Sequence, residues 1–286
     1  MTGSTIDRAP TGTARSRSGP RPPGRPGPLR RLVDSDRPYQ ILTFAVFATV
    51  WELYARQWGG LLIPTFTETV LATGELLGSA ELWHALWVSN QALFIGFAIA
   101  VAVGVPVGVV LGRFRTLERL TDVYLNILLV TPMAAIIPLL VMSVGFGLAS
   151  RVILVTVFSI VMVIVNSRTG VRQVDPSLIE MARSFGASER RIWRRILIPG
   201  AMPAIMTGIR LGLGRAVTGM VIVELLMVSV ALGGLILEYR GFFQAPLLYG
   251  TIVIILAEAL LLISAARWLE RKLTPWAGTN SSRSTR

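Results

Sequence analysis

Long runs of apolar residues, separated by shorter polar stretches, dominate the pattern of this 286-residue chain. Each run approaches the roughly 20 residues that an α-helix needs to cross about 30 Å of hydrocarbon. The pattern therefore predicts an all-α membrane protein with six transmembrane helices. The predicted spans cover residues 40–57, 86–112, 122–145, 151–167, 202–229 and 246–266.

Small residues recur at every fourth position of the second predicted span. They form one stripe along a helix, and such a stripe lets another backbone approach closely. The stripe consists of Ala92, Gly96, Ala100, Gly104, Gly108 and Gly112. The fifth span repeats the pattern with Gly208, Gly212 and Ala216. We expect a compact bundle in which these two helices meet each other or the matching helix of a second copy.

The third predicted span contains residues that interrupt a helix. Pro132 and Pro138 lack the amide hydrogen that a helix interior uses, and Asn126 and Thr131 add polar groups nearby. We expect a kink, whose freed carbonyl groups must find partners in the protein or line a watery pathway. Broken helices often border substrate routes. A kink that only shapes the packing fits this sequence as well.

A polar, arginine-rich segment separates the fourth and fifth predicted spans. The segment reads PSLIEMARSFGASERRIWRRILIPGAMP, residues 176–203. Asp175 and Pro176 are typical of the N-cap and first turn of a helix. Gly186 can adopt the left-handed conformation that ends this helix, and Ser188 can cap a second helix that ends at Pro199. The sequence predicts an elbow of two short helices, able to dock into a cleft of a soluble partner.

Composition supports a membrane protein, because 52% of the residues are hydrophobic, only 15% are charged, and the mean hydropathy is +0.61. Such values exclude an ordinary soluble globular protein of this length. The chain has no cysteine, which excludes disulfides and thiolate metal ligands. Its only histidine, His84, lies beside Trp83 and Trp87. This position is typical of an aromatic belt at the outer membrane interface, so we predict no metal site.

The net charge of +12 is unevenly distributed between the two sides of the predicted membrane protein. One side holds the eight arginines up to Arg37, three from Arg113 to Arg119, seven from Arg168 to Arg195, and five arginines or lysines from Arg267 onward. The other side holds only Arg56, Arg151 and Arg240. The positive-inside rule then places both termini in the cytoplasm. The basic charge indicates topology and contact with the lipid bilayer, not a nucleic-acid partner.

The polar ends of the chain differ from its middle. Residues 1–37 are rich in proline, glycine, serine and arginine, and they lack a periodic apolar pattern. We predict a disordered basic cytoplasmic tail, whose charge indicates solvation and attraction to anionic lipid more than a specific partner. The predicted transmembrane domain covers residues 38–272 and includes the elbow, residues 175–199. Residues 273–286 form a second polar tail.

The elbow has the spacing of a known motif. It reads Glu180-Met181-Ala182, then Gly186 after three residues, then Ile196-Leu197-Ile198-Pro199 after nine more. This spacing resembles the EAA loop of bacterial ABC importer permeases, which has Glu-Ala-Ala, Gly and Ile-x-Leu-Pro at these positions. Met181 and Ile198 depart from that pattern conservatively, replacing alanine and leucine.

The resemblance extends from about residue 40 to residue 272 and is strongest to the branch that imports nitrate, taurine and aliphatic sulfonates. It implies a six-helix permease in the cytoplasmic membrane of a bacterium, with the elbow as a coupling loop seated in a cytoplasmic ATPase subunit. The implied coupling residues are Glu180, Met181, Ala182, Phe185, Gly186, Ile196 and Pro199.

The same resemblance implies the other components of the machine. The chain itself would bind no cofactor, and ATP and Mg²⁺ would bind to the partner ATPase. An external solute-binding protein would deliver the cargo. A second permease copy would complete a homodimer, although pairing with a similar permease fits the sequence too.

Arg215 interrupts the apolar pattern of the fifth predicted span. A charge within the membrane is costly unless it faces water, a carboxylate or an anion. If Arg215 lies on the substrate pathway with Asn126 and Thr131, it would attract an anionic cargo such as a sulfonate or carboxylate. An ion pair with Glu224 or another buried carboxylate, or a place at the membrane interface, would also explain its charge.

Motifs of catalysis are missing from this sequence. It contains no GxxxxGK[ST], HExxH or GxSxG pattern, so we predict that the chain is not an enzyme and that a pump built from it uses the ATP site of a partner. The alternative is an autonomous secondary transporter or channel for a small anion. That alternative predicts inverted repeats and an intramembrane acidic relay. No convincing repeat is visible, and only Glu224 and Glu258 could form the relay, whereas pairing within the bundle explains both.

Overall fold

The computed structural model describes residues 37–226 and 231–275, and all regular elements within them are helical. The described chain divides into two units, one ending at Val50 and one beginning at Trp51. Outside the described residues lie nearly all of the predicted N-terminal tail, most of the predicted C-terminal tail, and residues 227–229 of the fifth predicted span.

The helical elements follow one another with short connections. In chain order they are α2 (Arg37–Tyr54), the π-helical turn η1 (Ala55–Gly59), α3 (Phe66–Leu77), α4 (Ala80–Arg113), α5 (Arg115–Val130), α6 (Met133–Val144), α7 (Leu148–Arg172), α8 (Pro176–Ser184), α9 (Glu189–Ile192), the π-helical turn η2 (Trp193–Leu197), α10 (Ile198–Leu226), α11 (Ala231–Gly241) and α12 (Ala245–Leu273).

Four helices of the described chain are long and apolar enough to cross a membrane: α4, α7, the stretch Glu189–Leu226 and α12. The pair α5 and α6 passes the same test together but is bent by 96°, so the count is five if this pair forms one span. The predicted count of six is thus not reproduced in full. The first predicted span corresponds to α2, whose 18 residues include the polar Arg37, Gln40 and Glu52.

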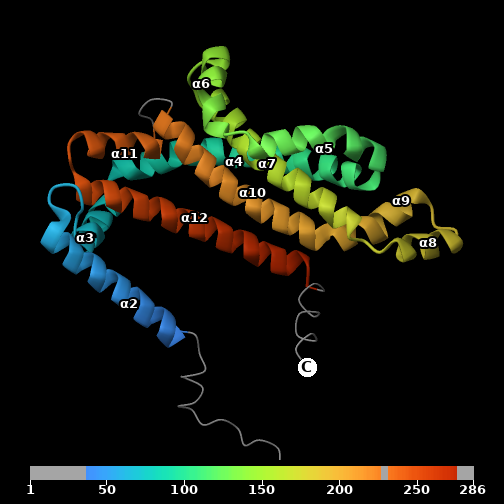
Figure 1. Cartoon of the computed structure of the whole chain (residues 1–286), viewed down its shortest axis with the longest axis horizontal. Helices are drawn as coiled ribbons and strands as arrows, with labels where there is room; N and C mark the ends of the chain where they lie inside the picture. The colour runs from blue at the N-terminus through green and yellow to red at the C-terminus, as the bar shows by residue number, and fades with distance from the viewer. Residues whose placement is uncertain (1–36, 227–230, 276–286) are drawn as a thin grey trace, which may run out of the picture. The chain divides into compact units, whose positions relative to one another are not determined.

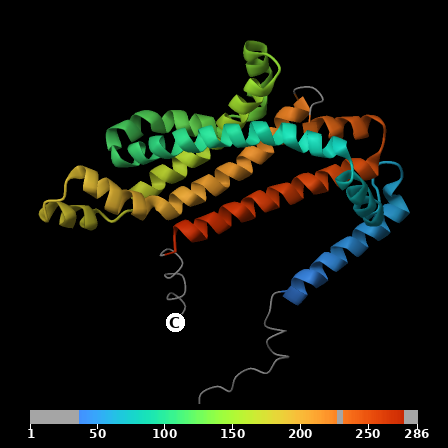
Figure 2. The same ribbon diagram turned by 180° about the vertical axis from the view of Figure 1, so that it is seen from behind.

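Helix α7 packs against α4 and α10 along much of its length (Figures 1 and 2). A Cβ atom added to Gly108 of α4 would lie 2.5 Å from the carbonyl oxygen of Ile164, and one added to Gly208 of α10 would lie 2.6 Å from the Cβ of Asn166. Both partners belong to α7. The small-residue stripes therefore pack against α7, whereas the sequence had led us to expect that they meet each other or the matching helix of a second copy.

The remaining predicted packing glycines follow the same arrangement. An added Cβ would come within 3.0 Å of an α7 atom at each of these positions: Gly96, Gly104, Gly112 and Gly212. α7 can receive two helices because it also carries small buried residues, Ser159, Ser167 and Gly170 among them. Close backbone approach on two sides is the packing that small residues permit in a membrane.

Two carboxylates, Glu224 near the end of α10 and Glu258 of α12, join helices of the bundle. Glu224 is fully buried and accepts hydrogen bonds from Ser89 Oγ of α4 at 2.9 Å and from the Gly233 amide of α11 at 3.1 Å. Arg151 of α7 places its guanidinium 3.8 Å from the same carboxylate. Glu258 of α12 accepts a hydrogen bond from Asn90 of α4. Both glutamates pair within the bundle, as the sequence predicted.

We predict that Gly108→Ala destabilises the bundle whereas Gly214→Ala does not. At Gly108 the new methyl group meets a backbone carbonyl, and overpacking of this kind costs about 1–3 kcal/mol. The space around an added Cβ at Gly214 is open. Thermal unfolding of the detergent-purified protein should show a lower midpoint, by several degrees, for the first variant only. Equal midpoints for the two variants would contradict the proposed close contact.

Candidate functional site

The first helix of the elbow, α8, is fixed at both ends by its own sequence. The Asp175 side chain accepts a hydrogen bond from the Ser177 amide at 2.8 Å, which lowers the pKa of the Asp175 carboxyl below its ordinary value. At the other end Gly186 has a φ of +71°, and the Ala187 amide donates to the Ala182 carbonyl at 2.9 Å. This pattern is a Schellman cap. The predicted start and end of this helix are confirmed.

The second half of the elbow differs from the prediction. Ser188 does occupy the N-cap position of α9, but its side chain makes no capping hydrogen bond. The helix also continues past Pro199, through η2 and into α10. A proline lacks the amide hydrogen and crowds the carbonyl four residues earlier. The π-helical turn, in which the Ile198 amide donates to the Trp193 carbonyl, widens the helix directly before Pro199 and keeps it continuous.

The inner side of the elbow is attached to the bundle. Ile192 and Leu197 are buried in a cluster with Val109 of α4 and Val171 of α7. Glu189 also forms ion pairs with Arg183 of α8 at 2.6 Å and Arg113 of α4 at 3.3 Å. Apolar packing and charge therefore hold both helices of the elbow on the ends of α4 and α7. Displacement of the elbow must move these helices.

The outer side of the elbow is an exposed apolar face. Phe185 is 83% exposed and Met181 is 53% exposed, with Leu178 on the same helix also exposed. Glu180 is exposed beside them. Large apolar side chains on a polar segment mark an interaction surface. We call these three residues, Leu178, Met181 and Phe185, the elbow face.

The predicted coupling residues therefore fall into two groups. Glu180, Met181, Phe185 and Gly186 are exposed. Ala182 and Ile196 pack against the buried cluster, and Pro199 is partly buried. The first group can contact a partner, whereas the second group shapes and anchors the elbow.

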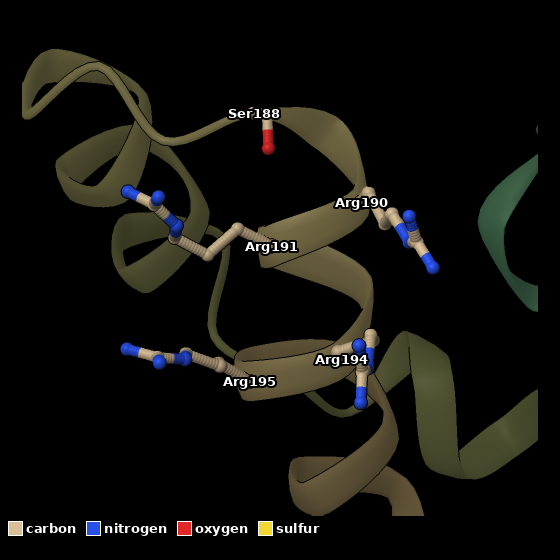
Figure 3. A pocket seen from close by; sticks show the side chains of 5 residues that line it. All are labelled: Ser188, Arg190, Arg191, Arg194 and Arg195. Carbon is tan, nitrogen blue, oxygen red and sulfur yellow. The ribbon is translucent and has the colours of Figure 1, made fainter.

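Four arginines form a basic surface on the second half of the elbow, in α9 and η2. Arg190, Arg191, Arg194 and Arg195 line, with Ser188, a hollow of about 450 Å³. Arg191 and Arg195 extend side by side in one direction, whereas Arg190 and Arg194 lie on another side of the helix (Figure 3). All four are exposed, and none forms an ion pair within the described residues. They were not among the predicted site residues, although their repetition at a spacing of four is visible in the sequence.

The break between α5 and α6 borders a second candidate site. The predicted kink is confirmed as the bend of 96° around Thr131 and Pro132. A cavity of about 270 Å³ lies at this break, lined by residues of α5, α6, α7 and α10. Arg215 and Thr131 both line it. Asn126 is not among the lining residues, and its amide donates to Asp122 on its own helix at 3.4 Å.

Arg215 does not pair with Glu224. The carboxylate of Glu224 contacts Ser89, Gly233 and Arg151 instead. Within the described chain Arg215 forms no hydrogen bond or ion pair, and its side chain is exposed toward the cavity. Arg210, one helical turn and a half earlier, pairs with Glu270 of α12 at 2.6 Å.

These helices and sites define a multi-pass membrane permease, and comparison with known proteins places it in a family. Residues 104–275 match the family described as "Binding-protein-dependent transport system inner membrane component". The chain is 32% identical over 242 residues to the putative aliphatic sulfonates transport permease protein SsuC of Bacillus subtilis (strain 168), covering 82% of this chain and 86% of that protein. It is 31% identical over 260 residues to the taurine transport system permease protein TauC of Escherichia coli (strain K12), covering 88% and 92%.

The fold has a solved counterpart. A chain of the inward-facing MetNI methionine ABC transporter superposes with a TM-score of 0.57 at 23% sequence identity, covering 68% of this chain and 94% of that one. The protein described here belongs to the family of binding-protein-dependent transport system inner membrane components. It is a multi-pass permease of an ABC importer in the inner membrane, a transport component and not an enzyme.

We predict that Gly186→Ala loosens the elbow. A residue with a side chain pays about 1 kcal/mol to adopt the left-handed conformation that Gly186 has, φ +71°. Hydrogen exchange at the Ala187 amide, which closes the cap, should become about fivefold faster. Gly241→Ala is the matched control, because its φ is not positive and the space around it is open. An unchanged exchange rate at Ala187 would show that the cap does not depend on glycine.

Proposed function

We propose that this permease is driven through its elbow by a separate ATPase and that it imports a small organic anion. Two copies form a homodimer, with two ATPase subunits on the cytoplasmic face and a solute-binding protein at the outer mouth. ATP and Mg²⁺ bind to the ATPase subunits, and the permease chain binds neither. Membership of a family named for binding-protein dependence supports the outer partner.

One observation carries this proposal: the elbow has an exposed apolar face on its first helix, and its second half, α9 and η2, continues without interruption into α10. Phe185 and Met181 offer apolar anchors, and the four arginines of α9 and η2 offer charge to an acidic groove. A partner interface commonly has this composition, aromatic and methionine anchors with arginine. Transmission of force needs both the docking face and the continuous helix into α10, since docking alone would not move the bundle.

The transmission follows from the contacts. ATP binding closes the pair of ATPase subunits and displaces the elbows docked in them. Because α9, η2 and α10 form one continuous helical stretch, α10 moves with the elbow. The ion pair of Glu189 with Arg113 carries the displacement to α4 as well. Rigid-body movement of these helices then alternates the bundle between inward-facing and outward-facing states.

The distribution of basic residues supports a cytoplasmic elbow with cytoplasmic chain ends, and it supports an anionic cargo. The elbow and both ends of the chain are the basic regions, so the positive-inside rule places them in the cytoplasm. The basic tail of residues 1–37 is then suited to anionic lipid. The relatives named for aliphatic sulfonates and taurine indicate a sulfonate-like cargo. An arginine on the intramembrane cavity agrees with an anion.

We predict that Phe185→Ala or Glu180→Ala uncouples the permease from its ATPase. Loss of one interface anchor typically costs 2 kcal/mol or more, so hydrolysis stimulated by the binding protein should fall by at least about tenfold. The complex is reconstituted in liposomes, and ATP hydrolysis and copurification of the ATPase are measured. Phe242→Ala is the control, since Phe242 is 70% exposed but lies after α11, away from the elbow.

Two outcomes would refute the proposal. One is stimulated hydrolysis and ATPase copurification in the elbow variants that equal those of the Phe242 control. The other is concentrative uptake by the purified permease alone, in liposomes that contain no ATPase. The second result would favour the autonomous transporter that the sequence left open.

A further inference from the structure

We propose that the cavity at the α5–α6 break is an intramembrane binding site for a short-chain alkanesulfonate, with Arg215 as the residue that binds the sulfonate group. This inference rests on the proposed import function and specifies the site at which the cargo is held during its passage. It also names the chemical feature that selects the cargo within the permease itself.

The first support is the position of an unpaired charge. Arg215 lies eleven residues before Leu226, the end of α10, which is about 16 Å along the helix axis at about 1.5 Å per residue. This is about half of the roughly 30 Å of hydrocarbon that a membrane presents. A guanidinium at that depth is costly unless water or an anion reaches it.

The second support is the contrast with two nearby arginines. Arg151 lies 3.8 Å from the Glu224 carboxylate, and Arg210 lies 2.6 Å from that of Glu270. These charges are compensated inside the chain. Arg215 has no such partner in the described residues, and no acidic residue lines its cavity. The fold therefore leaves one positive charge available to a mobile anion.

The third support is the lining of the cavity. Apart from Arg215 and Thr131, the walls consist of apolar side chains and proline, with Met133 and Phe158 as examples. A volume of about 270 Å³ is near the lower end of small-molecule pockets, about 300–1,000 Å³. An arginine fork binds an oxyanion through two parallel hydrogen bonds, and the walls shield an alkyl chain from water. Nitrate would use only the hydrogen bonds of the arginine, whereas an alkanesulfonate would also use the apolar walls.

The fourth support is the connection of this cavity to the elbow. Arg215 belongs to α10, which continues from the elbow, whereas Thr131 and Met133 belong to the break between α5 and α6. A displacement of α10 moves the charge relative to the opposite wall. The displacement of α10 that drives the bundle can therefore also change the affinity of the site for its anion. Release of the cargo requires such a change in affinity.

The absence of cysteine from the chain allows a direct test. Ala134→Cys places one thiol on the cavity wall, and Ser143→Cys places a matched thiol near the end of the same helix, outside the lining, where the native side chain is polar and exposed. The permease–ATPase complex in liposomes is treated with the sulfonate reagent 2-sulfonatoethyl methanethiosulfonate. Modification rates are measured with and without butane-1-sulfonate, and with butan-1-ol as the neutral analogue.

We expect butane-1-sulfonate to slow modification at position 134 and not at position 143, and butan-1-ol to have little effect. Arg215→Gln should raise the concentration needed for half protection by at least about tenfold, the effect of losing one charge-assisted contact. Arg215→Lys keeps the charge without the fork, and it should therefore retain part of the protection.

Three results would overturn the inference: equal protection by butan-1-ol, equal protection in Arg215→Gln, or no protection by butane-1-sulfonate at position 134. None of them would affect the proposed function, because the hydrolysis assay on Glu180 and Phe185 does not depend on the cavity. Conversely, the elbow variants could hydrolyse ATP normally while butane-1-sulfonate still protects the thiol at position 134. The anion site would then stand, and the permease would be driven through another contact.

Discussion

The close approach of α4 and α10 to the backbone of α7 is the constraint on which the rest of this structure depends. Lipid tails are as apolar as the side chains of these helices, so burial of apolar surface alone does not hold a membrane bundle together. Glycines such as Gly108 and Gly208 remove the side chains that would keep the backbones apart. Dense van der Waals contact along α7 then joins the three helices into one packed unit.

The proposed mechanism requires that the ATPase can move these three helices through the elbow. The elbow meets this requirement through the π-helical turn before Pro199, which preserves one helical path from α9 into α10. Buried Ile192 and Leu197 attach the same segment to α4 and α7. In the proposed mechanism, force that reaches α9 is therefore passed to α10 through one continuous helix.

The distribution of charge separates structure from transport in the membrane interior. Glu224 and Glu258 are held by neighbouring helices and serve to join them. Arg215 is left without a partner in the described chain, beside a cavity with apolar walls. Paired charges fix the arrangement of a bundle, whereas an unpaired one can bind and release a passing anion. If Arg215 binds the cargo as proposed, this division connects the packing of the protein to the selection of its cargo.

The sequence by itself determined the all-helical class, the elbow with its Asp175 and Gly186 caps, and the bend at Pro132, because each depends on chemistry within a few neighbouring residues. Only the tertiary structure decided that α7 receives both glycine stripes and that Glu224 pairs away from Arg215. It also decided that the helix passes through Pro199, where a local rule predicted its end. These outcomes depend on contacts between segments far apart in the chain, and a periodic apolar pattern does not say which helix lies beside which.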